Sequence, residues 1–119
     1  MGTPQRFALS VAEEFSKTPG PRTRAEGKHS AEEFLDTILE RRFDEAVASE
    51  SVLFVDLDGG YGYGTSFLEE AFGGLVRRKK NVQLVLDHLD FKSEEEPYLR
   101  DDAFSYIREA LTGSPKRRQ

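Results

Sequence analysis

The chain has 119 residues, of which 37% are hydrophobic and 33% are charged, so it can bury one compact core but is too short for two ordinary domains. Its net charge of −5 argues against a nucleic-acid-binding protein, because phosphate contacts need a concentrated basic face. The lack of cysteine excludes disulfides, a thiolate nucleophile and zinc sites built on cysteine.

The two ends of the chain are polar. We predict disorder over residues 1–5 and in a basic tail over residues 114–119, with a single domain over residues 6–113. There is no secretory signal and no run of about 20 apolar residues, so we expect a cytoplasmic protein without membrane contact. The basic cluster at residues 77–80 is interpreted as the end of a helix, where cations complement the helix dipole.

The first half of the chain predicts two strands and a helix. Residues 7–11 alternate between apolar and small or polar side chains, the period of a half-buried strand. After a turn rich in proline and glycine at residues 16–22, residues 22–26 are predicted to return as a short edge strand. Ser30 and Glu33 then form a capping box, and apolar residues follow at helical spacing as far as Val47.

The second half predicts two strands and two helices. Residues 52–57 form an apolar central strand that ends at Asp58. A helix begins at Ser66 and fades at the basic cluster, and residues 82–86 read as another short strand, continued by residues 87–91. The last helix begins at Pro97 and ends at Gly113. The predicted fold is a single α/β domain with a mixed sheet of about four strands and helices packed mainly on one face.

The bend between the central strand and the second helix contains the candidate catalytic residues. Asp56 and Asp58 stand in a DxDG pattern at a strand end, which resembles the first motif of the haloacid-dehalogenase phosphotransferases. In that family the first aspartate attacks phosphorus and the second protonates the leaving group. The sequence departs from the motif because residues 60–64 intervene before Thr65, and the later acidic pair of that family has no strand-end counterpart.

Other site types have less support in the sequence. The glycines of the bend match neither a P-loop nor a GxGxxG pattern, and Tyr61 and Tyr63 between them suit a protein-contact surface better than a phosphate cradle. His29 and His88 stand alone, without the spacing of metal ligands. We therefore expect no cofactor and no metal site.

The segments "FSKTPGPRTRAEGKHSAEEF" and "GYGTSFLEEAFGGL" are the parts of the chain that most specifically resemble a known protein family. Over residues 6 to about 110 the chain resembles the STAS-like family of unknown function, named for its similarity to sulphate transporter and anti-sigma-factor-antagonist domains. In the antagonists a serine before the helix is phosphorylated by a kinase of the GHKL ATPase type. The resemblance implies that Ser66 is the equivalent serine and Thr65 its neighbour, with Gly64 and Phe67 replacing an aspartate and a glycine of the motif.

Two residues of the bend have competing interpretations. Ser66 is the phosphoacceptor in one and, with Glu69, a capping box for the helix in the other. Phe67 either packs into the core, which its helical periodicity favours, or joins the tyrosines in an exposed aromatic patch.

The sequence as a whole predicts a non-enzymatic protein-interaction module in bacterial regulation. Its predicted contact residues are Tyr61, Tyr63, Thr65 and Ser66, and the resemblance implies a GHKL-type ATPase or kinase domain as the partner. The alternative is a small phosphotransferase that uses Asp56 and Asp58. The sequence leaves open whether the protein is a monomer or a homodimer.

Overall fold

Three short parallel strands form the sheet, in the order β1 (Phe7–Ser10), β2 (Leu53–Asp56), β3 (Leu89–Lys92). The structure is a computed structural model that describes residues 7–112, so the predictions for residues 1–5 and 114–119 lie outside the described part. The predicted mixed sheet of four strands is not confirmed for this part, because both strand pairings are parallel and the one extra predicted strand, at residues 22–26, forms a turn and a 3-10 helix.

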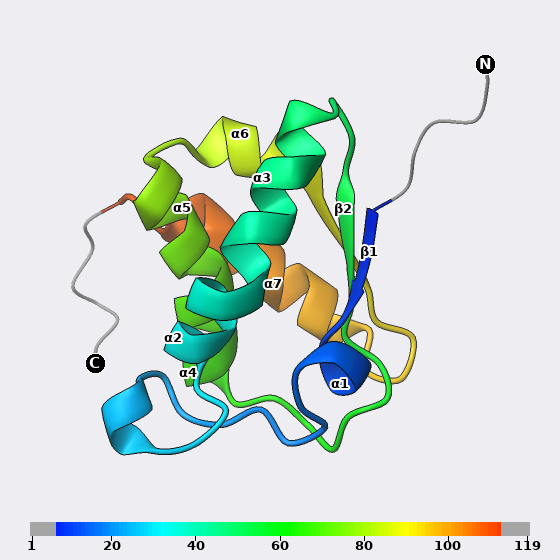
Figure 1. The fold of residues 1–119 in the computed structure, drawn as a ribbon, viewed down its shortest axis with the longest axis vertical. Coiled ribbons are helices and arrows are strands. Elements are labelled where there is room, and N and C mark those ends of the chain that lie inside the picture. Colours follow the sequence, from blue (N-terminus) through cyan, green and yellow to red (C-terminus); the bar gives the residue numbers. More distant parts are fainter. Residues whose placement is uncertain (1–6, 113–119) are drawn as a thin grey trace.

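The strands are joined by helical crossovers, and Figure 1 shows the long helices together on one side of the strands. Two right-handed crossovers that advance in the same direction along a sheet place their helices on the same face. The helical elements in chain order are α1 (Val11–Glu14), the 3-10 helix η1 (Arg24–Glu26), α2 (Ala31–Phe34), the π-helix η2 (Leu35–Leu39), α3 (Glu40–Ala48), α4 (Thr65–Leu68), the π-helix η3 (Glu69–Gly73), α5 (Gly74–Lys79), α6 (Val82–His88) and α7 (Tyr98–Glu109).

The segment predicted as an edge strand at residues 22–26 instead covers the start of α2. The carbonyl oxygens of Pro21 and Arg22 accept the N–H groups of Ala31 and Glu32 at 2.9 and 3.0 Å. Helix N-termini have N–H groups without partners inside the helix, and these carbonyls satisfy two of them. The chain then makes the short 3-10 turn η1 rather than joining the sheet.

The segment predicted as a strand at residues 82–86 is the helix α6. Asn81 is its N-cap, and its side chain accepts the Leu84 N–H at 2.9 Å. Lys80, just before it, has a φ of 56°, so the chain turns sharply between α5 and α6. The third strand therefore begins only at Leu89.

The predicted helix after residue 30 is confirmed, with Ser30 as its N-cap, but the return bond from the Ser30 N–H to the Glu33 side chain is absent among the described residues. The Ser30 hydroxyl accepts the Glu33 N–H at 3.0 Å, and α2, η2 and α3 continue without a break to Ala48. The core lies between this helical layer and the sheet. Its largest side chains that are 0% exposed are Phe34, Phe43, Phe67 and Phe72, so the core interpretation of Phe67 is confirmed. Within residues 7–112, no helix has both the length and the apolar character needed to cross a membrane.

Candidate functional site

The candidate site lies at the carboxyl ends of the three strands. The register places Ser10, Asp56 and Lys92 side by side as the last residues of their strands. Because the strands are parallel, the loops that follow them all begin at this edge of the sheet. Of the candidate residues, Asp58, Tyr61 and Tyr63 lie in the loop that follows Asp56, and Thr65 and Ser66 begin the helix α4 after that loop.

Asp58 joins the loop after β2 to the loop after β3. Its carboxylate accepts the N–H groups of Glu94 and Glu95, each at 2.9 Å, and the Glu95 carboxylate accepts the Gly59 N–H at 3.0 Å. Burial alone raises the pKa of Asp58, but the hydrogen bonds from the Glu95 and Glu94 N–H groups and the charge of Lys92 outweigh it, so the pKa lies below its usual value. Asp58 is therefore a structural anion that fixes the bend.

Asp56 lies beside this anion and is tied to the same loop. Its Oδ1 accepts the Asp58 N–H at 2.9 Å, and the Lys92 ammonium lies 3.8 Å from Asp56 Oδ2 and 3.7 Å from Asp58 Oδ2. The two aspartates of the phosphotransferase alternative thus share one cation at the strand ends. The sequence interpretation missed both Lys92 and Glu95, although each lies at or just beyond the carboxyl end of a strand.

Tyr63 is the inner tyrosine of the bend. Its ring centroid lies 6.0 Å from that of Phe67, and it packs against the core. Its hydroxyl is buried and has no hydrogen-bond partner within residues 7–112. Burial raises the pKa of Tyr63, and the charges of Asp56 and Asp58 raise it further. Tyr63 therefore packs between the loop and the core, and its side chain is partly buried.

Tyr61 is the outer tyrosine. Its side chain is 81% exposed, the largest value among the exposed apolar and aromatic residues of the described part. Its backbone N–H donates to the Lys17 carbonyl at 2.8 Å, which holds the bend against the loop after α1. An exposed aromatic side chain on a fixed backbone loses little conformational entropy when a partner covers it.

Thr65 and Ser66 are both exposed at the start of α4. The predicted capping box of Ser66 with Glu69 is wrong, because Gly64 is the N-cap residue and no side chain caps the helix. The helix begins one residue earlier than the serine cap requires, so Ser66 lies inside its first turn. Within the described part of the chain, neither hydroxyl makes a hydrogen bond, and both are open to solvent.

A model of the STAS-like domain of unknown function matches residues 30–99, which is more than half of the chain. This chain belongs to that family. The match includes β2, the bend, both π-helices and β3, and it leaves β1 outside. Comparison with curated proteins and with solved structures found no match.

In this STAS-like domain, the acidic residues that follow Ser66 are neutralised by arginines. The Arg22 guanidinium contacts Glu69 at 2.5 Å and Glu70 at 3.1 Å, and Arg77 contacts Glu69 at 2.9 Å. Burial raises the pKa of Glu69, but the hydrogen bonds from Arg77 and Arg22 outweigh it and leave the pKa below its usual value. The negative charge near Ser66 is thereby paired.

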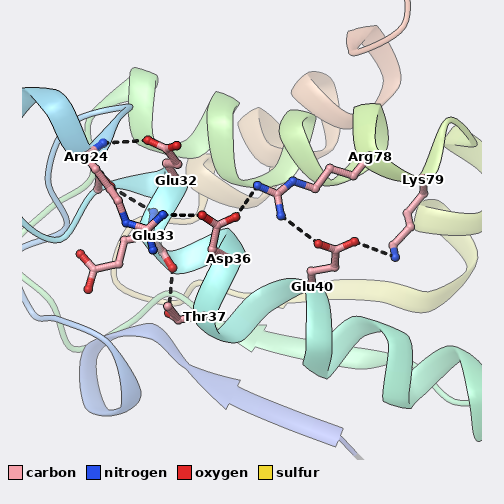
Figure 2. A network of polar contacts seen from close by, with 9 residues as sticks. Arg24, Glu32, Glu33, Asp36, Thr37, Glu40, Arg78 and Lys79 are labelled. Atoms are coloured by element: carbon pink, nitrogen blue, oxygen red, sulfur yellow. Dashed lines mark hydrogen bonds and ion pairs between the residues drawn. The ribbon is translucent and has the colours of Figure 1, made fainter.

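Two further residues of the basic cluster of the STAS-like domain, Arg78 and Lys79, are also paired with acidic side chains. Figure 2 shows Arg78 between Asp36 and Glu40, at 2.5 and 2.8 Å, with Lys79 on the other side of Glu40 at 3.0 Å. Arg24 contacts Asp36 at 2.5 Å. Arg78 and Lys79 therefore fasten α5 to the helix α2–η2–α3 through acidic partners.

The two histidines are separate from the bend loop. His88 Nδ1 lies 2.7 Å from the Ser51 carbonyl oxygen, and the His29 ring packs edge-on against Phe15 with centroids 5.8 Å apart. Within residues 7–112, no group of three or more histidine or acidic side chains is placed to hold a metal ion.

Proposed function

We propose that this STAS-like domain is a non-enzymatic, cytoplasmic protein-interaction module in bacterial regulation, with the bend at residues 59–66 as its docking surface. The observation that carries the proposal is the position of Tyr61, 81% exposed on a loop whose backbone is held from two sides. Tyrosine is enriched in protein interfaces, and residues that dominate binding energy are frequently tyrosines.

The docking surface is switched by phosphorylation of Ser66 or Thr65. Both side chains are exposed, and Ser66 does not cap the helix, so its modification removes no structural hydrogen bond. A phosphate there lies at the positive end of the dipole of the continuous helix α4–η3–α5. The repulsion expected from Glu69 and Glu70 is reduced because Arg22 and Arg77 pair with them.

The partner by family resemblance is an ATPase or kinase domain of the GHKL type, and the role resembles that of an anti-sigma-factor antagonist. Such a partner supplies both the binding surface and the phosphoryl donor. A phosphate on Thr65 or Ser66 adds about two negative charges to the same segment that contains Tyr61, which would change the affinity of the docking surface.

The proposal is tested by affinity capture with the immobilised domain, followed by mass spectrometry of the bound proteins and of the peptide that contains Thr65 and Ser66. The matched set is wild type, Tyr61→Ala, Ser66→Glu and Leu111→Ala. Leu111 is 47% exposed beyond the far end of α7 and serves as the control for a lost apolar contact. We expect one partner with wild type and Leu111→Ala and its loss with the other two. Equal recovery with all four would contradict the assignment of the surface.

A further inference from the structure

The sheet has two outer edges, one on β1 and one on β3, and such edges are templates for pairing with another chain. The Leu57 N–H donates to the Lys92 carbonyl at 2.8 Å, so the backbone N–H and C=O groups of Lys92 point toward β2. Those of Asp90, two residues earlier in the strand, point the same way. The backbone groups of Leu89 and Phe91 therefore point outward. The same alternation, carried through the register of β2 with β1, leaves the backbone N–H and C=O groups of Ala8 and Ser10 pointing outward from β1.

The outer edge of β1 is closed by an ion pair. The Ser10 N–H donates to Glu14 Oε2 at 3.1 Å, and Arg42 donates to the Ala8 carbonyl at 2.5 Å. Arg42 also holds Glu14, with 2.7 Å between Nη1 and Oε1. The pair thus supplies one acceptor and one donor where the backbone of a fourth strand would supply them.

At the outer edge of β3 a carboxylate held by an arginine again takes an outward N–H group, while no arginine contact to an outward carbonyl is present there among residues 7–112. The Phe91 N–H donates to Asp90 Oδ1 at 2.8 Å, and Arg100 from α7 contacts the same oxygen at 3.0 Å. The Arg100 guanidinium lies 5.1 Å above the Phe104 ring, which packs edge-on against Phe91. The carboxylate and its arginine are therefore held beside the edge rather than free in solvent.

We propose that the pairs Glu14–Arg42 and Asp90–Arg100 are edge guards, which prevent the sheet from taking a fourth strand from a second copy of this chain. The two edges use the same chemistry although their residues come from different elements. In each case a carboxylate accepts an outward N–H group, and an arginine from a helix fixes the carboxylate. A docking strand must displace a charged pair that is already bonded to the edge, and desolvating that pair opposes the docking.

The test compares three double variants with wild type over a concentration series, by light scattering coupled to size-exclusion chromatography. Glu14→Ala/Arg42→Ala opens the edge of β1, and Asp90→Ala/Arg100→Ala opens the edge of β3. Arg41→Ala/Glu45→Ala removes an exposed ion pair on α3 that touches neither edge, and is the matched control. Circular dichroism establishes that each variant is folded.

We expect both edge variants to gain mass with concentration, toward about twice the wild-type value, while the control follows wild type. Folded edge variants that keep the wild-type mass throughout would overturn the proposal. If a variant fails to fold, hydrogen exchange on the wild-type protein tests the proposal in its place. The guards predict that the outward Ser10 and Phe91 amides exchange at least tenfold more slowly than in an unstructured chain, and unprotected amides there would overturn the proposal as well.

Discussion

Asp58 and Glu95 fasten two neighbouring loops to each other from both sides. Asp58 Oδ1 accepts the Glu95 N–H at 2.9 Å, while Glu95 Oε1 accepts the Gly59 N–H at 3.0 Å. The carboxyl edge of the sheet thus holds the bend with Tyr61 in one conformation. Pre-organisation of this kind lowers the entropic cost of binding a partner.

Replacing Asp58 by Ala is expected to destabilise the domain by roughly 2 kcal/mol, because hydrogen bonds to a charged group contribute about 1.5–3 kcal/mol. Urea unfolding measures the change. Asp87→Ala is the control, since Asp87 is exposed on α6 and, among the described residues, its carboxylate accepts a hydrogen bond from the Gln83 side chain alone. Equal stability of the two variants would show that the Asp58 hydrogen bonds do not fasten the loops.

Gly20→Ala is expected to destabilise the domain by more than about 2 kcal/mol, because the added Cβ would lie 2.2 Å from the Lys28 carbonyl oxygen. The Gly20 N–H also donates to the His29 carbonyl at 2.8 Å, so the backbone has little room to move away. Gly64→Ala is the matched control, since within residues 7–112 no atom beyond its chain neighbours lies within 4 Å of its added Cβ, and its φ of −79° suits any residue. Thermal melts compare the two, and a harmless Gly20→Ala would contradict this packing.

The network around Arg78 predicts a pH dependence of stability. Hydrogen bonds from Arg78 lower the pKa values of Asp36 and Glu40 below their ordinary values of 3.8 and 4.5. A carboxyl whose pKa is lowered on folding stabilises the protein above its unfolded pKa, and this contribution is lost as the pH falls through the folded pKa.

Arg78→Ala is therefore expected to lower the free energy of unfolding by about 1 kcal/mol at neutral pH, a value that allows for solvent screening of these partly exposed groups. The difference from wild type should shrink as the pH falls below the ordinary pKa values. Arg108→Ala, on the exposed side of α7, should show neither effect. A pH-independent loss in Arg78→Ala would indicate lost packing instead of lost charge pairing.

The phosphotransferase alternative makes a separate prediction for Asp56. We expect the wild-type domain with Mg²⁺ to hydrolyse a general aryl phosphate no faster than the Asp56→Asn variant. The reason is that Asp58, the acid in that mechanism, already accepts backbone hydrogen bonds from Glu94 and Glu95. Turnover that needs Mg²⁺ and disappears in Asp56→Asn would favour the enzyme over the interaction module.

Sequence patterns predicted some local features of this fold and missed others. The helix after Ser30 could be predicted because its cap and its apolar spacing agree. Residues 82–86 were predicted wrongly because a short apolar run suits a strand and a helix equally, and the signal that decides is the Asn81 cap. The cap at Ser66 was also predicted wrongly, because the sequence has a capping pattern there but the N-cap of the helix is Gly64.

The assignment of the bend as the site stays a prediction, and its geometry could not be predicted from the sequence. The bend and its tyrosines stand out in the sequence, yet nothing local shows that Tyr63 turns inward while Tyr61 stays exposed. The bonds of Asp58 to residues 94 and 95 span 36 and 37 positions, and such contacts depend on the parallel register of β2 and β3. Glu95 and Lys92 could have been suggested only once these strands were known to be neighbours.

The central claim is that Tyr61 anchors a partner on the bend, and the most direct measurement is a calorimetric titration of the captured partner with three forms of the domain. Wild type and Leu111→Ala should bind with equal affinity, while Tyr61→Ala should bind roughly 30-fold more weakly, the loss of about 2 kcal/mol expected when a dominant interface residue is truncated. Equal affinity of Tyr61→Ala and wild type, with both folded, would contradict the claim.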